Sequence, residues 1–82
     1  MSSEENLGEA VTALKDVEAD GSVPKSVKIK ISAIVKILED KGEILIKVSR
    51  AMHELEELSE DSNLPSFTRT QLFHIVSMLE VV

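Results

Sequence analysis

The chain has 82 residues, the size of one domain, and its lack of cysteine excludes disulfides and thiolate metal sites. Hydrophobic residues make up 43% of the chain and aromatic residues 2%, so the core must consist mainly of aliphatic side chains, as in packed helices. A net charge of −6 disfavours nucleic acid or an anionic membrane as the main partner, because both select clustered lysine and arginine.

The first residues differ from a targeting segment. The chain opens with Met1-Ser2-Ser3-Glu4-Glu5, whereas a signal peptide begins with basic and then apolar residues. No apolar run reaches the length that is needed to span a bilayer. These observations predict a cytoplasmic protein that makes no membrane contact.

The first predicted helix runs from about Glu4 to Ala19, because its apolar residues recur with a 3.6-residue period. Ser2 and Glu5 have the spacing of a capping box at its start. We expect Gly21 to end the helix in the left-handed conformation. The inward residues of this helix are expected to be Leu7, Ala10, Val11, Leu14 and Val17.

The second predicted helix, from about Pro24 to Lys41, is rich in β-branched residues, which lower helix propensity. Two or three short strands are therefore the competing prediction for this segment. Helical spacing favours the helix, and so does the clearly helical segment after Pro65, which matches this one 41 residues later. The expected inward residues are Val27, Ile31, Ile34, Val35 and Leu38.

The third predicted helix runs from about Glu43 to Glu60, and the fourth follows Pro65 and ends near Val81. Between them, the polar run Asp61-Ser62-Asn63 breaks the helical pattern. The expected inward residues are Leu45, Val48, Met52, Leu55 and Leu58 in the third helix and Thr68, Leu72, Ile75, Val76 and Leu79 in the fourth.

The second half of the chain repeats the first half with an offset of 41 residues. Two such units are too few for an open array of helical repeats, so the two hairpins must close on each other. The predicted fold is all-α, a four-helix bundle of two duplicated helical hairpins (residues 4–41 and 43–82) in one domain, 1–82, with a bromodomain-like or up-and-down arrangement. The matching pairs include Leu14 and Leu55, Val17 and Leu58, Asp20 and Asp61, Pro24 and Pro65, Ile34 and Ile75, and Leu38 and Leu79.

One part of the second repeat resembles a known family. The segment from Asp61 to Thr70, which reads DSNLPSFTRT, and the segment from Ile75 to Glu80, which reads IVSMLE, are similar to the signature of the archaeal uncharacterised protein family UPF0147. The resemblance covers nearly the whole chain. It implies an archaeal origin and a helical bundle, and it brings no established activity.

No residue pattern indicates catalysis. The acidic run that ends the third helix lacks a nucleophile and base in a catalytic arrangement, and the chain has no glycine-rich phosphate loop. His53 shares a helix face only with Glu56 or Glu57, which gives too few ligands for a metal ion. We therefore predict that the protein is not an enzyme and has no cofactor and no metal.

Basic residues occur on the second and fourth predicted helices. Lys25 and Lys36 lie with Ile29 on the side of the second helix that faces away from the core. Arg69 opens the fourth helix, where free backbone N–H groups favour an anion, and Lys28 is its repeat partner. An ion pair with a carboxylate at the end of a neighbouring helix is the competing interpretation. The candidate contacts to an anion or nucleic acid are Lys25, Lys28, Lys36 and Arg69.

The fourth helix carries apolar residues that lie off its inward stripe. Phe73 is the largest of them, and Val81 and Val82 extend the apolar surface to the C-terminus. Together with Ile29 they are the candidate interface residues. We predict a non-catalytic protein-interaction module that forms a homodimer or binds a protein partner through the fourth helix. The alternative is a nucleic-acid or ribonucleoprotein accessory protein that uses the basic face of the second helix.

Overall fold

The computed structural model describes residues 3–82, and this part of the chain contains four helices and no strand. The helical prediction for the β-branched second segment is therefore confirmed. Every predicted helix boundary lies within two residues of the observed one. The capping role predicted for Ser2 lies outside the described residues. The helices are α1 (Ser3–Ala19), α2 (Lys25–Glu39), α3 (Ile44–Ser59) and α4 (Ser66–Glu80).

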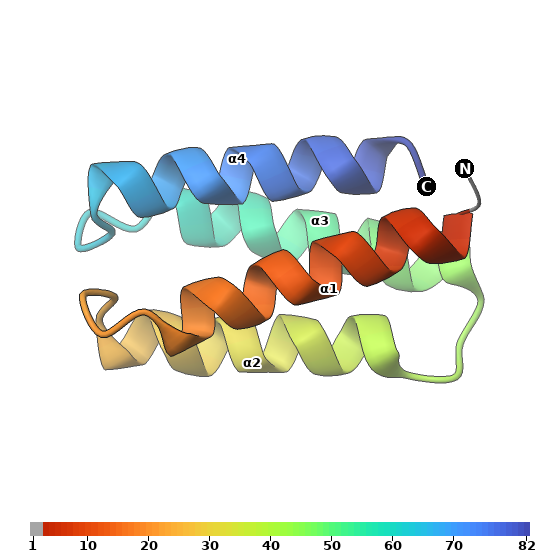
Figure 1. Cartoon of the computed structure of the whole chain (residues 1–82), viewed down its shortest axis with the longest axis horizontal. Coiled ribbons are helices and arrows are strands. Elements are labelled where there is room, and N and C mark those ends of the chain that lie inside the picture. Colours follow the sequence, from red (N-terminus) through yellow and green to blue (C-terminus); the bar gives the residue numbers. More distant parts are fainter. Residues whose placement is uncertain (1–2) are drawn as a thin grey trace.

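The helices form a bundle of 33 × 21 × 20 Å in which each helix packs against two neighbours. α1 lies beside α2 and α4, and α3 lies beside the same two helices, whereas the backbones of the diagonal pairs are farther apart. Short connections join consecutive helices, so the chain runs up and down the bundle, and the start of α1 and the end of α4 lie at one end of the molecule (Figure 1). Of the two arrangements that the sequence leaves open, the structure has the up-and-down one.

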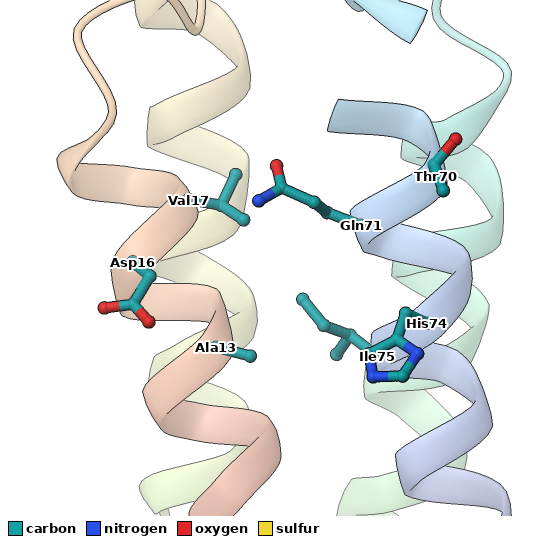
Figure 2. Close-up of a pocket in the computed structure, with 7 residues that line it drawn as sticks. All are labelled: Ala13, Asp16, Val17, Thr70, Gln71, His74 and Ile75. Atoms are coloured by element: carbon teal, nitrogen blue, oxygen red, sulfur yellow. The ribbon is translucent and has the colours of Figure 1, made fainter. Parts of the chain in front are cut away.

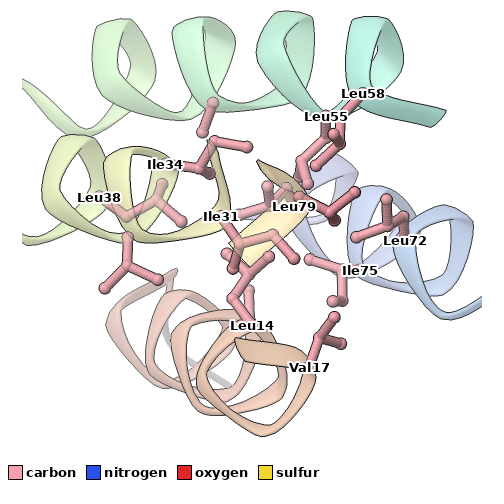
Figure 3. Close-up of a cluster of buried hydrophobic side chains, with 14 of the residues drawn as sticks. Leu14, Val17, Ile31, Ile34, Leu38, Leu55, Leu58, Leu72, Ile75 and Leu79 are labelled. Carbon is pink, nitrogen blue, oxygen red and sulfur yellow. The ribbon is translucent and has the colours of Figure 1, made fainter. Parts of the chain in front are cut away.

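The core is one cluster of aliphatic side chains from all four helices (Figure 3). In α1, α2 and α4 the fully buried residues belong to the predicted inward stripes, while some stripe residues, such as Leu7 and Val76, are only partly buried. In α3 the prediction for Leu45 is wrong, because this side chain is 70% exposed and lies beside the core, in a groove between α3 and α4. The small side chain of Ala51 is instead fully buried.

The turns inside the two hairpins have the same hydrogen bonds. Asp20 Oδ1 accepts the backbone N–H of Ser22 at 2.9 Å, and Asp61 Oδ1 accepts that of Asn63 at 2.9 Å. The prediction of a left-handed Gly21 is wrong, since no described residue has a positive φ. The aspartate side chain stabilises each turn through local hydrogen bonds, so no glycine in a special conformation is needed.

The helices that follow these turns also begin alike. Pro24 has φ −57° and ψ 146°, and Pro65 has φ −59° and ψ 146°. Their carbonyls accept the backbone N–H groups of Lys28 and Arg69 at 3.1 and 3.0 Å. The two hairpins thus agree in backbone detail as well as in sequence, which fits a duplicated unit.

Candidate functional site

Six large hydrophobic side chains in the described part of the chain are exposed to solvent. Each of them has a polar or charged residue at the position 41 residues away, which we call its repeat partner. The six pairs are Ile29 with Thr70, Leu45 with Glu4, Ile46 with Glu5, Phe67 with Ser26, Phe73 with Ser32, and Val81 with Asp40.

The buried residues follow the opposite rule. Among the residues whose burial the structure describes, each buried apolar one has an apolar repeat partner except Val27, whose partner is Thr68. The duplicated pattern therefore specifies the core that both hairpins need. The exposed apolar residues lie outside this pattern, so each belongs to the surface of one hairpin only.

One of these residues, Leu45, borders a groove over α3 and α4. A groove of about 490 Å³ runs between these helices near the C-terminal end of α4. Its apolar lining includes Leu45 and Met52 from α3 and Leu79 and Val82 from the α4 end of the chain, and its polar lining is formed by Ser49, His53, Glu56 and Glu80.

Phe73 lies on the same side of α4 as this groove. Arg69, one turn earlier, reaches the carbonyl of Ser59 at the end of α3 and that of Asp61 just beyond it, so this side of α4 faces α3. Phe73 and Glu80 continue the same row of α4, and Glu80 lines the groove. The ring of Phe73 is 53% exposed. We call the apolar set Leu45, Met52, Phe73 and Val82 the α3–α4 surface.

The four predicted interface residues are not on one surface. Phe73 and Val82 belong to the α3–α4 surface, but Ile29 lies on α2, which is diagonal to α4. Val81 is exposed at the end of α4, where its carbonyl accepts a hydrogen bond from the side chain of Asn6 on α1. Sequence reasoning missed Leu45 and Met52, although the charged repeat partner of Leu45 could have indicated that Leu45 is exposed.

The four predicted cationic residues differ in their surroundings. The guanidinium of Arg69 donates hydrogen bonds to the backbone carbonyls of Ser59 (2.8 Å) and Asp61 (3.1 Å). Lys25 and Lys36 are exposed on the outer face of α2, with Ile29 between them.

Lys28 lies near the first hairpin turn. Two hydrogen bonds from Ser22 and, to a smaller extent, the charge of Lys28 lower the pKa of Asp20. Lys28 thus acts on Asp20 through its charge and forms no ion pair with it within 4.0 Å, while Arg69 binds carbonyls.

The histidines are separate from each other. His53 Nε2 lies 3.0 Å from Glu57 Oε1, one helical turn away on the exposed face of α3, whereas His74 lies on α4 beside α1. In residues 3–82 no three histidine, cysteine, aspartate or glutamate side chains are placed to hold a metal ion together. None of the four helices, as far as they are described, is long and apolar enough to cross a membrane.

Relatives of this chain match it over nearly its whole length. A UPF0147 protein from Methanosarcina mazei is 30% identical over 81 residues, which cover 98% of this chain and 87% of the relative. A UPF0147 protein from Sulfurisphaera tokodaii is 31% identical over 80 residues, covering 96% and 90%. These relatives come from archaea, in agreement with the origin that the resemblance implied.

Two crystal structures have the same fold. The unknown function protein MMP1188 superposes with a TM-score of 0.91 at 29% identity, covering 99% of this chain and 93% of that one. A UPF0147 protein from Thermoplasma acidophilum superposes with a TM-score of 0.88 at 26% identity, covering 95% and 93%. The uncharacterised protein family UPF0147 matches residues 1–82, and the chain therefore belongs to this family.

Proposed function

We propose that this protein is a non-catalytic interaction module that self-associates through the α3–α4 surface. The observation that carries the proposal is the position of Phe73, an exposed ring on the same face as an apolar groove. Neither Phe73 nor Leu45 has an apolar repeat partner, so the duplicated core does not account for them. Exposed apolar residues that gather on one face are typical of protein–protein contacts.

A second copy of the chain suits this surface because the surface contains both a protruding ring and a groove. In a twofold symmetric pair, the ring of each copy can enter the groove of the other. Phe73 and Val82 are separated along α4 by about 13 Å, given a rise of 1.5 Å per residue. A twofold axis between them brings the two α4 helices together in antiparallel orientation and covers both grooves at once.

Light scattering after size-exclusion chromatography tests the proposal with two pairs of variants. Leu45→Glu and Ile46→Glu place the same charge at neighbouring exposed positions in the first turn of α3, where glutamate is compatible with the helix. Because successive residues of a helix point about 100° apart, only Leu45 lines the groove. Phe73→Glu and its control Phe67→Glu make the same comparison on α4.

We expect the unmodified protein to be a dimer, and Leu45→Glu and Phe73→Glu to raise its dissociation constant at least about tenfold, as removal of a central apolar contact does. The controls Ile46→Glu and Phe67→Glu should remain dimeric, and circular dichroism should show that all four variants are helical. A protein that stays monomeric at every concentration would contradict the proposal, as would controls that dissociate as readily as the test variants.

The alternative function, nucleic-acid binding through Lys25, Lys28, Lys36 and Arg69, has less support because Arg69 is already hydrogen-bonded to α3. The salt dependence of the binding affinity distinguishes the two functions. Binding of phosphates by several lysines weakens steeply as salt rises, whereas an apolar interface persists.

A further inference from the structure

A second groove runs along the opposite side of α4, between α4 and α1. It consists of two adjoining hollows of about 330 and 680 Å³, which share Ala13 and Asp16 and therefore form one channel. This channel lies between α4 and α1, whereas the α3–α4 surface lies between α4 and α3, so a dimer formed through the α3–α4 surface need not cover it. The channel is therefore independent of the proposed self-association.

The floor of the channel contains apolar side chains, and its α1 wall contains the small residues Gly8 and Ala13. Figure 2 shows Val17 and Gln71 pointing toward each other from α1 and α4, with Ala13 opposite Ile75 in the same way. Farther along, the α1 wall contains Gly8, where an added Cβ would meet no atom within 4 Å. Small residues of this kind let the backbone of another helix approach closely, to an interaxial distance of about 8 Å.

The charged residues of the channel are almost all on the α1 wall and are acidic. Glu5, Glu9 and Asp16 line the channel at intervals of four and seven residues, which places them along one side of α1 over about 16 Å. Glu9 and Asp16 form no ion pair with any described residue. The α4 wall contributes Thr70, Gln71 and His74, which can form hydrogen bonds, and no lysine or arginine.

We infer that this channel binds a basic amphipathic helix of a partner protein. The apolar floor accepts the apolar stripe of such a helix, and the row of carboxylates on α1 is complementary to lysines or arginines beside that stripe. The three carboxylates span about three turns, so the occupant is a helical segment of at least that length.

A synthetic peptide can serve as the probe. It has about 15 residues of lysine, leucine and alanine, arranged so that its lysines flank one apolar stripe, and a scrambled peptide of the same composition is the control. Fluorescence anisotropy measures affinity, and amide chemical shifts locate the binding site. We expect the amphipathic peptide to bind saturably and to shift the amides of Gly8, Ala13, Gln71 and His74.

Two variants test the carboxylates and the shape of the channel separately. Glu9→Gln combined with Asp16→Asn should raise the peptide dissociation constant at least about tenfold. The control Glu54→Gln with Glu60→Gln removes the same charge from α3 and its C-cap and should change the dissociation constant less than about threefold. Gly8→Leu changes no charge and enters open space in α1, so it should fold and still weaken binding by filling the channel.

Several results would overturn the inference. The scrambled peptide could bind as tightly as the amphipathic one, the α3 control could weaken binding as much as the α1 variant, or the shifted amides could lie outside the channel. Each of these would mean that the acidic protein attracts cations without a defined site. If the α1 variant instead changed the oligomeric state of the protein, a second copy of the chain would be the occupant.

Discussion

The buried hydroxyl of Thr68 distinguishes the second hairpin from the first. Thr68 is 0% exposed, and its Oγ1 has no hydrogen-bond partner within residues 3–82. At the equivalent position of the first hairpin, Val27 is equally buried and presents a methyl group instead. An unpartnered hydroxyl in an apolar core destabilises the folded state by about 1–3 kcal/mol, because it loses its hydrogen bonds to water.

Thr68→Val should therefore stabilise the protein by about 1 kcal/mol, which raises the melting temperature by roughly 4–8 °C for a domain of this size. The change keeps the branched shape of the side chain, and Val27 shows that the fold accepts valine in this environment. Thermal unfolding followed by circular dichroism measures the shift.

The reciprocal change Val27→Thr is the matched control, and it should lower the melting temperature by a similar amount. A lower melting temperature for Thr68→Val would mean that the hydroxyl has a partner, such as a buried water molecule.

The contact between Arg69 and the end of α3 is a second difference between the hairpins, and it concerns how a helix ends. The last carbonyls of a helix have no partner within the helix and carry partial negative charge. Arg69 of α4 donates to the carbonyls of Ser59 and Asp61, whereas its repeat partner Lys28 donates no side-chain hydrogen bond among the described residues.

Arg69→Met should accordingly lower the free energy of unfolding by about 1–3 kcal/mol, because two charge-assisted hydrogen bonds are lost while the length of the side chain is kept. Urea unfolding measures this change. Lys28→Met, the control in the first hairpin, should have a smaller effect, and equal effects of the two substitutions would show that the hydrogen bonds of Arg69 contribute little.

The elements themselves were predictable because the chain contains the same hairpin twice. Periodicity alone left the segment at α2 undecided between helix and strands, and its match to the segment after Pro65 favoured the helix. The error at Leu45 has a physical cause. Leu45 has the helical apolar spacing from Val48, but the buried side of α3 ends at Val48 and Leu45 lies in the groove. The charged repeat partner of Leu45, Glu4, is the signal that distinguishes an exposed apolar residue from a buried one at such a position.

The candidate surfaces are harder to predict from the sequence than the helices. Phe73 was recognised as exposed because it lies off the stripe of one helix, which is a local property. The α3–α4 groove and the α1–α4 channel depend on which helices are neighbours, and this order was left open. The direction of Arg69 toward backbone carbonyls was not predictable either, because a sequence pattern gives no position for the carbonyls of another helix.

Because the fold is duplicated, the end of α4 and the start of α1 are placed like the two helix ends that the α2–α3 connection joins. α1 packs against α4 as α3 packs against α2, and the side chain of Asn6 donates to the carbonyl of Val81 at 3.3 Å. A link from α4 back to α1 therefore occupies the place that the α2–α3 connection has in the other half of the bundle (Figure 1).

A circular permutant tests this equivalence. Val82 is joined to Ser3 by about four glycine and serine residues, and the chain is opened between Lys41 and Gly42, both of which are exposed. We expect the permutant to form the same bundle, with a melting temperature within about 5 °C of the original, because its core and both hairpin turns are unchanged.

A second permutant with the same linker but opened between Gly21 and Ser22 is the control. This opening separates Asp20 from the N–H and hydroxyl groups of Ser22, which bind its carboxylate at 2.9 and 2.7 Å. The second permutant should be the less stable of the two, because a hairpin turn contributes hydrogen bonds that the α2–α3 opening spares. If the two permutants were equally stable, or if the first did not fold, the prediction would be wrong. The stability of the fold would then depend on the original order of all four helices and not on the two intact hairpins.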